Sequence, residues 1–131
     1  IKHNNFLPYV MAAIQAKKSR WNDAVVLNIF ERACDTTIAN IFIVKDEIIY
    51  TPALEEGCIA GIMRKHILEQ LTKNHFSTSE SKITVADLAA ADEVFLSNSI
   101  HNIRWVKSIG EKKYENTFTK KIYKVIAPTI L

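Results

Sequence analysis

Three features of the sequence place chemically capable residues in unusual surroundings: a lysine, a carboxylate and a pair of glycines. Lys2 stands alone in a polar stretch ahead of the first predicted helix. A lysine there is usually solvated, although its amine can also join a carbonyl group as a Schiff base. Asp35 opens the segment DTTIAN, whose polar groups interrupt an otherwise apolar hairpin. A buried carboxylate needs a partner, but a cap at the end of a strand is the commoner reason for one.

Two of the three glycines, Gly57 and Gly61, bracket the expected start of a helix in the segment GCIAGIMR. The first N–H groups of a helix are unpaired and carry partial positive charge, so they suit a phosphate. Glycine lets the backbone approach such an anion closely. Alone, this pattern is more often an ordinary loop-to-helix junction. Taken together, an amine, a carboxylate and an anion-binding helix start are what pyridoxal phosphate needs for its aldehyde, its pyridine nitrogen and its phosphate.

The elements that must position these residues follow from the spacing of the apolar residues. Spacings of three and four residues predict amphipathic helices, and β-branched runs around a polar turn predict a hairpin. Thr84 with Asp87 predicts a capping box. In chain order we expect a helix at 5–20, strands at 24–27, 36–44 and 48–51, a helix from Gly57 or Cys58 to 73, a polar loop at 75–81, a short helix at 85–91, strands at 92–97 and 103–109, and a helix after Asn116 or Thr117. This order predicts an α+β class, with helices packed on a mixed sheet.

Composition bounds the alternatives. The 131 residues, 48% hydrophobic with a net charge of +3, make one globular domain and exclude a disordered chain. No apolar run of about 18 residues is present, so we expect no membrane span. The 17 lysines and arginines are scattered, which argues against nucleic acid as a partner. Cys34 and Cys58 lack metal-ligand spacing, so we expect no metal and two reduced thiols in a cytoplasmic protein. The sequence opens at Ile1 and is expected to be part of a longer protein.

The motifs D-T-T-I-A-N-I-F, I-Y-T-P, G-C-I-A-G-I-M-R and DEVFLSNSIHNIRWV follow one another along the chain. On these residues the sequence resembles the C-terminal half of the class IV, or fold-type IV, pyridoxal-phosphate enzymes. That family contains branched-chain aminotransferases, D-amino-acid aminotransferases and 4-amino-4-deoxychorismate lyases. The resemblance implies that residues 1–131 are the C-terminal, cofactor-anchoring domain, a mixed sheet or pseudo-barrel packed with helices.

The resemblance also implies the roles of individual residues. Lys2 matches the lysine that holds the cofactor as a Schiff base and later moves the Cα proton. Asp35 matches the carboxylate that keeps the pyridine nitrogen protonated. The resemblance places the phosphate site at Gly61, Ile62, Met63 and Ser99, which would bind through backbone N–H groups and the Ser99 hydroxyl. It places the substrate-facing loop at Ile100 and His101.

Several residues depart from the family pattern. Asp35 stands where members usually have glutamate, one methylene longer. Met63 stands where many members have threonine, which removes a hydroxyl but keeps the backbone donor. Phe6 replaces a tyrosine of the branched-chain aminotransferases, and the loop from Ser97 to Ile100 looks more like the lyase type.

These departures favour a 4-amino-4-deoxychorismate lyase, which eliminates pyruvate and leaves 4-aminobenzoate for folate synthesis. An amino-acid aminotransferase, of the D-amino-acid type more than the branched-chain type, is the alternative. A non-catalytic domain that retains the fold is the second alternative. In either enzyme the substrate is a small amino-acid-like molecule.

Family members carry an N-terminal domain that is missing from this sequence, and the cofactor lies between the two domains. That domain supplies a phosphate-binding arginine and much of the substrate pocket. The chain alone is therefore expected to bind the cofactor weakly and to be inactive. Its exposed interdomain face is expected to drive assembly into a homo-oligomer.

Overall fold

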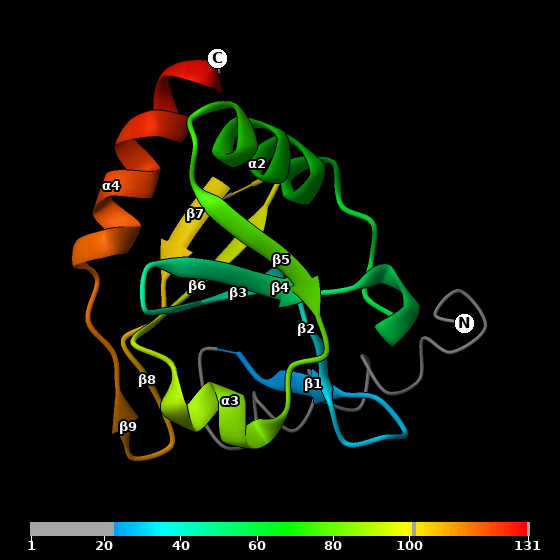
Figure 1. Ribbon diagram of the computed structural model, residues 1–131. Coiled ribbons are helices and arrows are strands. Elements are labelled where there is room, and N and C mark those ends of the chain that lie inside the picture. Colours follow the sequence, from blue (N-terminus) through cyan, green and yellow to red (C-terminus); the bar gives the residue numbers. More distant parts are fainter. Residues whose placement is uncertain (1–22, 101, 131) are drawn as a thin grey trace.

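The computed structural model describes residues 23–100 and 102–130, and its centre is a five-stranded mixed sheet (Figure 1). The strand order is β5-β4-β3-β6-β7, and all neighbours are antiparallel except the parallel pair β4 and β5. The strands of the sheet are β3 (Asn40–Lys45), β4 (Ile48–Pro52), β5 (Ser77–Ser81), β6 (Glu93–Asn98) and β7 (Asn102–Trp105). Two small hairpins accompany it, β1 (Val25–Leu27) with β2 (Ala33–Thr36) and β8 (Ser108–Ile109) with β9 (Lys112–Lys113). The helix expected over 5–20 lies outside the described residues.

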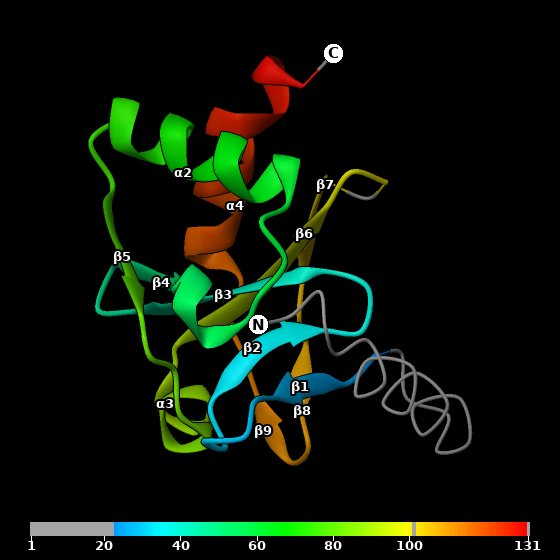
Figure 2. The same cartoon turned by 90° about the vertical axis from the view of Figure 1, so that its right-hand side faces the viewer.

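Helices and the β1–β2 hairpin cover the sheet from two sides (Figures 1 and 2). The helices are α2 (Ile62–Lys73), α3 (Val85–Ala90) and α4 (Thr117–Ile126), with short 3-10 turns η2 (Leu54–Glu56) and η3 (Ala127–Thr129). One core cluster joins the sheet to α2 and α4, and a second joins it to α3 and β2. The fold is therefore α+β, as expected. None of the described helices is both long and apolar enough to cross a membrane.

Strand β3 is buried on both faces because each core cluster takes one of them. Phe42 and Val44 belong to the cluster with α2 and α4, and Ile41 and Ile43 to the other. A strand covered on both sides needs a continuous apolar run, which is what the sequence NIFIV supplies. The ring of Phe42 stacks on that of Phe95 in β6, with centroids 4.7 Å apart. This pairing fixes the centre of the sheet.

The hairpin predicted from 36–44 and 48–51 is confirmed between β3 and β4, in the register Lys45 to Ile48. Its two-residue turn, Asp46 and Glu47, has φ values of 50° and 64°. Both values are left-handed, as in the type I′ turn that matches the twist of paired strands.

The prediction of one strand over 36–44 is wrong in one respect, because a turn precedes Asn40 and only the later part of this range forms a strand. β2 ends at Thr36 and β3 begins only at Asn40. The hydroxyl of Thr36 accepts from the Ala39 N–H at 3.0 Å, and the Thr36 N–H donates to the Ala39 carbonyl at 2.9 Å. The turn segment is as rich in β-branched residues as a strand, so the spacing of apolar residues does not reveal the turn that the Thr36 side chain closes. The turn brings Asp35 beside Asn40.

Three other elements also differ from the prediction. The polar loop expected at 75–81 contains β5, an edge strand whose polar residues suit its exposed position. The helix expected from Gly57 or Cys58 begins at Ile62, and Gly57 instead caps the end of η2 with a left-handed φ of 95°. The strand expected at 103–109 is divided into β7 and β8.

The capping box predicted at Thr84 and Asp87 is confirmed at the start of α3. The Thr84 hydroxyl accepts from the Asp87 N–H at 3.1 Å, and the Asp87 carboxylate accepts from the Thr84 N–H at 2.9 Å. Local sequence was sufficient here because both partners lie within one helical turn.

Helix α4 is capped from a distance rather than by its own N-cap residue. Asn116 occupies the N-cap position, but its side chain makes no capping hydrogen bond. The buried carboxylate of Glu93 in β6 instead accepts from the N–H groups of Phe118 at 2.8 Å and Thr119 at 2.7 Å. This contact ties α4 to the sheet.

We predict that Glu93→Gln lowers the free energy of unfolding by about 1–3 kcal/mol. The amide replaces one acceptor oxygen with a donor that faces helix N–H groups, and it removes a negative charge from the positive end of α4. Urea unfolding followed by circular dichroism measures the change. Glu115→Gln, at an exposed position near the same helix, is the matched control and should change stability by less than about 0.5 kcal/mol. Equal effects of the two substitutions would contradict the capping role of Glu93.

Candidate functional site

A hollow of 130 Å³ lies where the β2–β3 turn, the start of α2 and the end of β6 meet. Its lining includes five of the residues predicted to bind the cofactor: Asp35, Gly61, Ile62, Met63 and Ser99. The rest of the lining consists of neighbours of these residues: Thr36, Ile38, Ala39, Asn40, Ile59 and Asn98. The fold therefore brings together predicted site residues that are far apart in the sequence.

Three predicted residues are not part of this lining. Ile100 follows Ser99 in the chain, and its side chain is 83% exposed. Lys2 and His101 lie outside the described residues. Among the described residues, no group of three or more His, Cys, Asp or Glu side chains could hold a metal ion.

The carboxylate of Asp35 is only 2% exposed and receives donors on both oxygens. Its Oδ1 accepts from Asn40 Nδ2 at 2.9 Å, and its Oδ2 accepts from the backbone N–H of Ile59 at 2.8 Å. These bonds fix the plane of the carboxylate. Asp35 is also one of the residues that line the hollow.

Asn40 joins the two walls of the hollow, a role that the sequence reasoning did not assign. Besides Asp35, its Nδ2 donates to the carbonyl oxygen of Ile59 at 2.8 Å. Asn40 is the first residue of β3, and Ile59 lies on the approach to α2. The available signal was a polar residue at the head of the apolar run IFIV. We refer to Asp35, Asn40, Ile59 and Gly61 as the Asp35 frame.

Gly61 completes the Asp35 frame because no side chain fits there. A Cβ atom at this position would lie 2.5 Å from Asn40 Oδ1, closer than real Cβ contacts allow. Gly61 is also the N-cap residue of α2, in an extended conformation with φ of −66°. The glycine is therefore required by close packing against Asn40 rather than by a left-handed backbone.

Within residues 23–100 and 102–130, no side-chain hydrogen bond caps the start of α2. The N-cap makes no side-chain hydrogen bond, and no acidic residue lies in the first turn. Ile62 and Met63 are the first two residues of this 12-residue helix and both line the hollow. Unpaired N–H groups at the positive end of a helix favour an anion. The hydroxyl-bearing Ser99 faces the same hollow.

Two other polar residues of the motifs, Thr51 and Arg64, stabilise the surrounding fold and do not line the hollow. Thr51 is buried, and its hydroxyl donates to the carbonyl oxygen of Ile41 at 2.8 Å across the sheet. Arg64 is buried as well, and its Nη2 donates to the Pro52 carbonyl at 3.1 Å and pairs with Glu80. Arg64 thus anchors α2 to β4 and β5, and it is absent from the lining of the hollow.

Two buried cysteines adjoin the Asp35 frame in sequence. Cys34 precedes Asp35, and its thiol donates to the Val26 carbonyl at 3.2 Å. Cys58 precedes Ile59, and its thiol donates to the Pro52 carbonyl at 3.5 Å. Val26, Cys34 and Cys58 form a small apolar cluster of their own.

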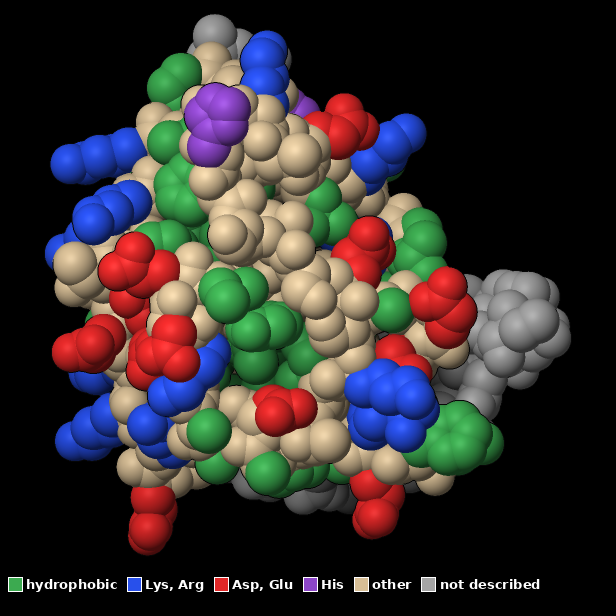
Figure 3. All heavy atoms as spheres, in the orientation of Figure 1, with side chains coloured by type: hydrophobic (Ala, Val, Ile, Leu, Met, Phe, Trp, Pro, Cys, Tyr) green, Lys and Arg blue, Asp and Glu red, His purple; other side chains and the backbone are tan. Residues whose placement is uncertain are grey.

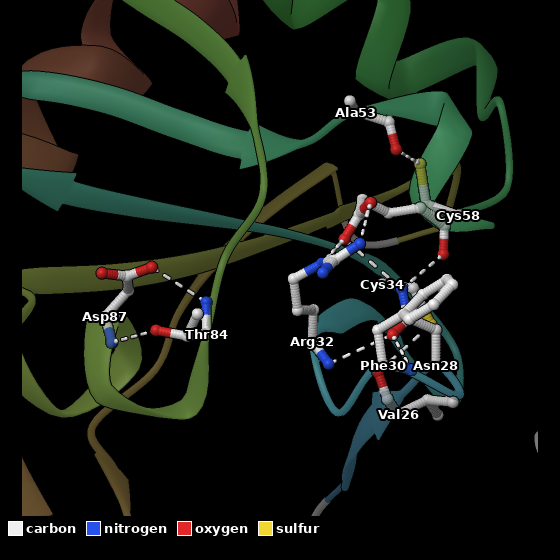
Figure 4. Close-up of polar contacts among 10 residues, drawn as sticks. Val26, Asn28, Phe30, Arg32, Cys34, Ala53, Cys58, Thr84 and Asp87 are labelled. Carbon is white, nitrogen blue, oxygen red and sulfur yellow. Dashed lines mark hydrogen bonds and ion pairs between the residues drawn. The ribbon is translucent and has the colours of Figure 1, made fainter.

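A cluster around Glu56 holds η2, the turn that precedes Ile59, against the β1–β2 hairpin. Figure 4 labels Asn28, Phe30 and Arg32 of this cluster. The Arg32 guanidinium donates two hydrogen bonds to the buried Glu56 carboxylate. Asn28 Nδ2 donates to the Glu56 carbonyl at 3.1 Å, and Arg32 lies over the ring of Phe30. The hydrogen bond from Arg32 lowers the pKa of Glu56, and the same bond raises the pKa of Arg32.

Residues 1–109 match the family described as amino-transferase class IV. The chain belongs to this family. Its resemblance to the class IV enzymes is thus confirmed, and the enzymes of the family use pyridoxal phosphate.

Individual relatives include both lyases and aminotransferases. The aminodeoxychorismate lyase of Vibrio harveyi is 39% identical over 109 residues, which are 83% of this chain and 40% of that protein. A structure described as a 4-amino-4-deoxychorismate lyase from Legionella pneumophila superposes with a TM-score of 0.88 at 30% identity, over 95% of this chain and 47% of that one. The structure of the branched-chain aminotransferase of Thermoproteus uzoniensis with norvaline superposes with a TM-score of 0.90 at 28% identity. The match covers 95% of this chain and 42% of that one. The fold is that of fold-type IV enzyme domains, and the chain spans less than half of each of these relatives.

We predict that Gly61→Ala destabilises the protein by about 1–3 kcal/mol, because the new methyl group overlaps Asn40. In an Asn40→Ala background the same substitution should cost at least about 1 kcal/mol less, since the obstructing side chain is gone. Urea unfolding of the four proteins in this double-mutant cycle measures the coupling. Ala60→Ser, at the exposed neighbouring position, controls for local changes. Additive effects of Gly61→Ala and Asn40→Ala would contradict the close contact.

We also predict that Glu56→Gln destabilises the protein at neutral pH and that the difference shrinks in acid. The Glu56 pKa lies below its ordinary value of 4.5 in the folded protein. The Arg32–Glu56 pair therefore adds its full contribution to the free energy of unfolding at pH values above 4.5. This contribution is lost as the pH falls through the lowered pKa of Glu56 in the folded protein. Urea unfolding of both proteins across this acid range checks the trend, with the exposed Glu55→Gln as control. A stability difference independent of pH would rule out the ionised pair as its source.

Proposed function

We propose that this chain is the cofactor-anchoring C-terminal domain of a 4-amino-4-deoxychorismate lyase, which eliminates pyruvate from its substrate and leaves 4-aminobenzoate. The observation that carries this proposal is the single hollow lined by Asp35, the start of α2 and Ser99. The 39% identity to the Vibrio harveyi lyase favours this activity. The TM-score of 0.90 to a branched-chain aminotransferase makes amino-acid transamination the second candidate.

The residues around the hollow fit the polar groups of pyridoxal phosphate. A phosphate suits the unpaired N–H groups of Ile62 and Met63 together with the Ser99 hydroxyl. A pyridine nitrogen suits a fixed, buried carboxylate such as Asp35. When bound, the cofactor supplies an electron-poor ring that stabilises negative charge at the Cα of an amino-acid substrate.

Each residue then has a separate task in the proposed enzyme. Asp35, oriented by Asn40 and Ile59, holds a proton on the ring nitrogen. The first N–H groups of α2 and Ser99 hold the phosphate end in place. Lys2, through the family resemblance, binds the cofactor aldehyde and moves the Cα proton of the substrate. Through the same resemblance, Ile100 and His101 would belong to the loop that faces the small amino-acid-like substrate.

The described residues form one wall of such a site. Ligand pockets usually measure about 300–1,000 Å³, so a hollow of 130 Å³ is too small to enclose the cofactor. Exposed isoleucines surround it, with Ile38, Ile59 and Ile62 at 57%, 49% and 84% exposure. An apolar rim of this kind suits a covering domain. We propose that an N-terminal domain of the whole protein covers it, supplies the phosphate-binding cation, and works within a cytoplasmic homo-oligomer.

We predict that Asp35→Asn in the full-length protein lowers turnover at least about a hundredfold, or about 2.7 kcal/mol in activation free energy. A neutral amide of the same shape cannot keep the ring nitrogen protonated. Steady-state kinetics with the cofactor bound measures the loss, and circular dichroism verifies folding. Asp35→Glu, which restores the usual family residue, is the matched control and should retain activity. Near-normal turnover of Asp35→Asn would show that Asp35 only caps the turn.

Two assays on the full-length protein separate the candidate activities. Release of pyruvate from 4-amino-4-deoxychorismate indicates the lyase, and amino-group transfer to a 2-oxo acid indicates the aminotransferase. Borohydride reduction after addition of pyridoxal phosphate tests the link to Lys2 by mass spectrometry. Absence of label at Lys2 would contradict both enzymes and leave a domain that keeps the fold without catalysis.

A further inference from the structure

A second groove, of 330 Å³, runs between β7 and α4 and shares no lining residue with the hollow at Asp35. Figure 1 shows β7 beside α4 at the margin of the sheet. The lining residues come from these two elements and the residue before α4: Ile103, Trp105, Asn116, Thr119, Lys120, Tyr123 and Lys124. We call this feature the β7–α4 groove.

Strand β7, which lines one side of this groove, is the last strand in the order of the five-stranded sheet. Within the described part of the chain, β7 pairs with β6 on one side and with no strand on the other. The Val106 N–H donates to the Val94 carbonyl. In an antiparallel pair every second residue bonds to the partner strand, so the next residue of β7 that bonds to β6 is Arg104, opposite Leu96. The N–H and C=O groups of Ile103 and Trp105 therefore point away from β6. These are the two β7 residues that line the groove.

The opposite wall of the groove is basic. Lys120 and Lys124 are four residues apart on α4, so they lie on the same face of the helix. The sequence of α4, TFTKKIYKVI, contains no acidic residue, and none lines the groove. In Figure 3, Lys and Arg side chains project from the side of the molecule on which α4 runs, and Asp and Glu side chains lie below them in this view. Trp105 and Tyr123, at 42% and 48% exposure, add apolar surface between the cations and the strand.

We propose that the β7–α4 groove binds an extended, acidic segment of another polypeptide, which adds to β7 as a further strand. The outward groups of Ile103 and Trp105 would bond the backbone of the segment, as in other cases of strand addition. Because successive side chains in a strand alternate in direction, every second side chain of the segment faces α4. Carboxylates at those positions meet Lys120 and Lys124.

A second copy of this chain fits the groove less well. Pairing two β7 edges would bring the Lys120 and Lys124 side chains of one α4 toward those of the other, and like charges across an interface oppose binding. Arg104 in β7 would add to this repulsion. Charge complementarity therefore selects an acidic occupant over a copy of the same strand.

The test uses the full-length protein and a fluorescein-labelled peptide that alternates valine with glutamate. We expect saturable binding by fluorescence anisotropy, weakened by added salt. Hydrogen exchange should slow in the peptic fragment that contains Ile103 and Trp105. A peptide that alternates valine with lysine should bind at least about tenfold more weakly.

Charge reversal on α4 supplies the matched variants. Lys120→Glu combined with Lys124→Glu should weaken the glutamate peptide about tenfold and favour the lysine peptide. Lys121→Glu makes the same type of charge change on the same helix outside the groove, and it should change affinity less than about twofold. Circular dichroism verifies that each variant is folded. The proposal is overturned if neither peptide binds, if both bind equally, if Lys121→Glu acts like the double variant, or if Ile103 and Trp105 are already protected without peptide.

Discussion

A carboxylate buried to 2% exposure must find donors inside the protein, and Asp35 finds them on two segments that approach it from different directions. Leaving such a group without donors would cost several kcal/mol. The turn closed by Thr36 brings Asn40 to one oxygen, and the chain leaving η2 brings the Ile59 N–H to the other. Satisfying Asp35 therefore fixes the position from which α2 begins.

The described arginines near the site stabilise the framework and do not enter the hollow. Arg64 ties α2 to β4 and β5, and Arg32 neutralises Glu56 below the Asp35 frame. The described lining of the hollow therefore offers hydrogen-bond donors and one carboxylate but no cation. This division suits a site built from two parts, one that positions a bound group and one that supplies positive charge.

The sequence predicted the elements whose signals are local. The capping box of Thr84 and the hairpin around Asp46 depend on neighbours within a few residues, and both are confirmed. The cap of α4 by Glu93 and the turn at Thr36 were missed, because one depends on contacts across 25 and 26 positions and the other mimics a strand. Five of the eleven residues that line the hollow were predicted from the family motifs, since these specify residue types directly. The bridging role of Asn40 was not predicted, because it arises only when the turn at Thr36 brings Asn40 beside Asp35.

The two cysteines beside the Asp35 frame give it an internal chemical reporter. Both thiols are buried and donate to backbone carbonyls, Cys34 to Val26 and Cys58 to Pro52. A thiol in that state is shielded from alkylating reagents, which attack the exposed thiolate. Modification therefore requires the β1–β2 hairpin or the segment before α2 to open. The alkylation rates of Cys34 and Cys58 thus measure how often each side of the Asp35 frame opens, on a timescale that a static structure does not contain.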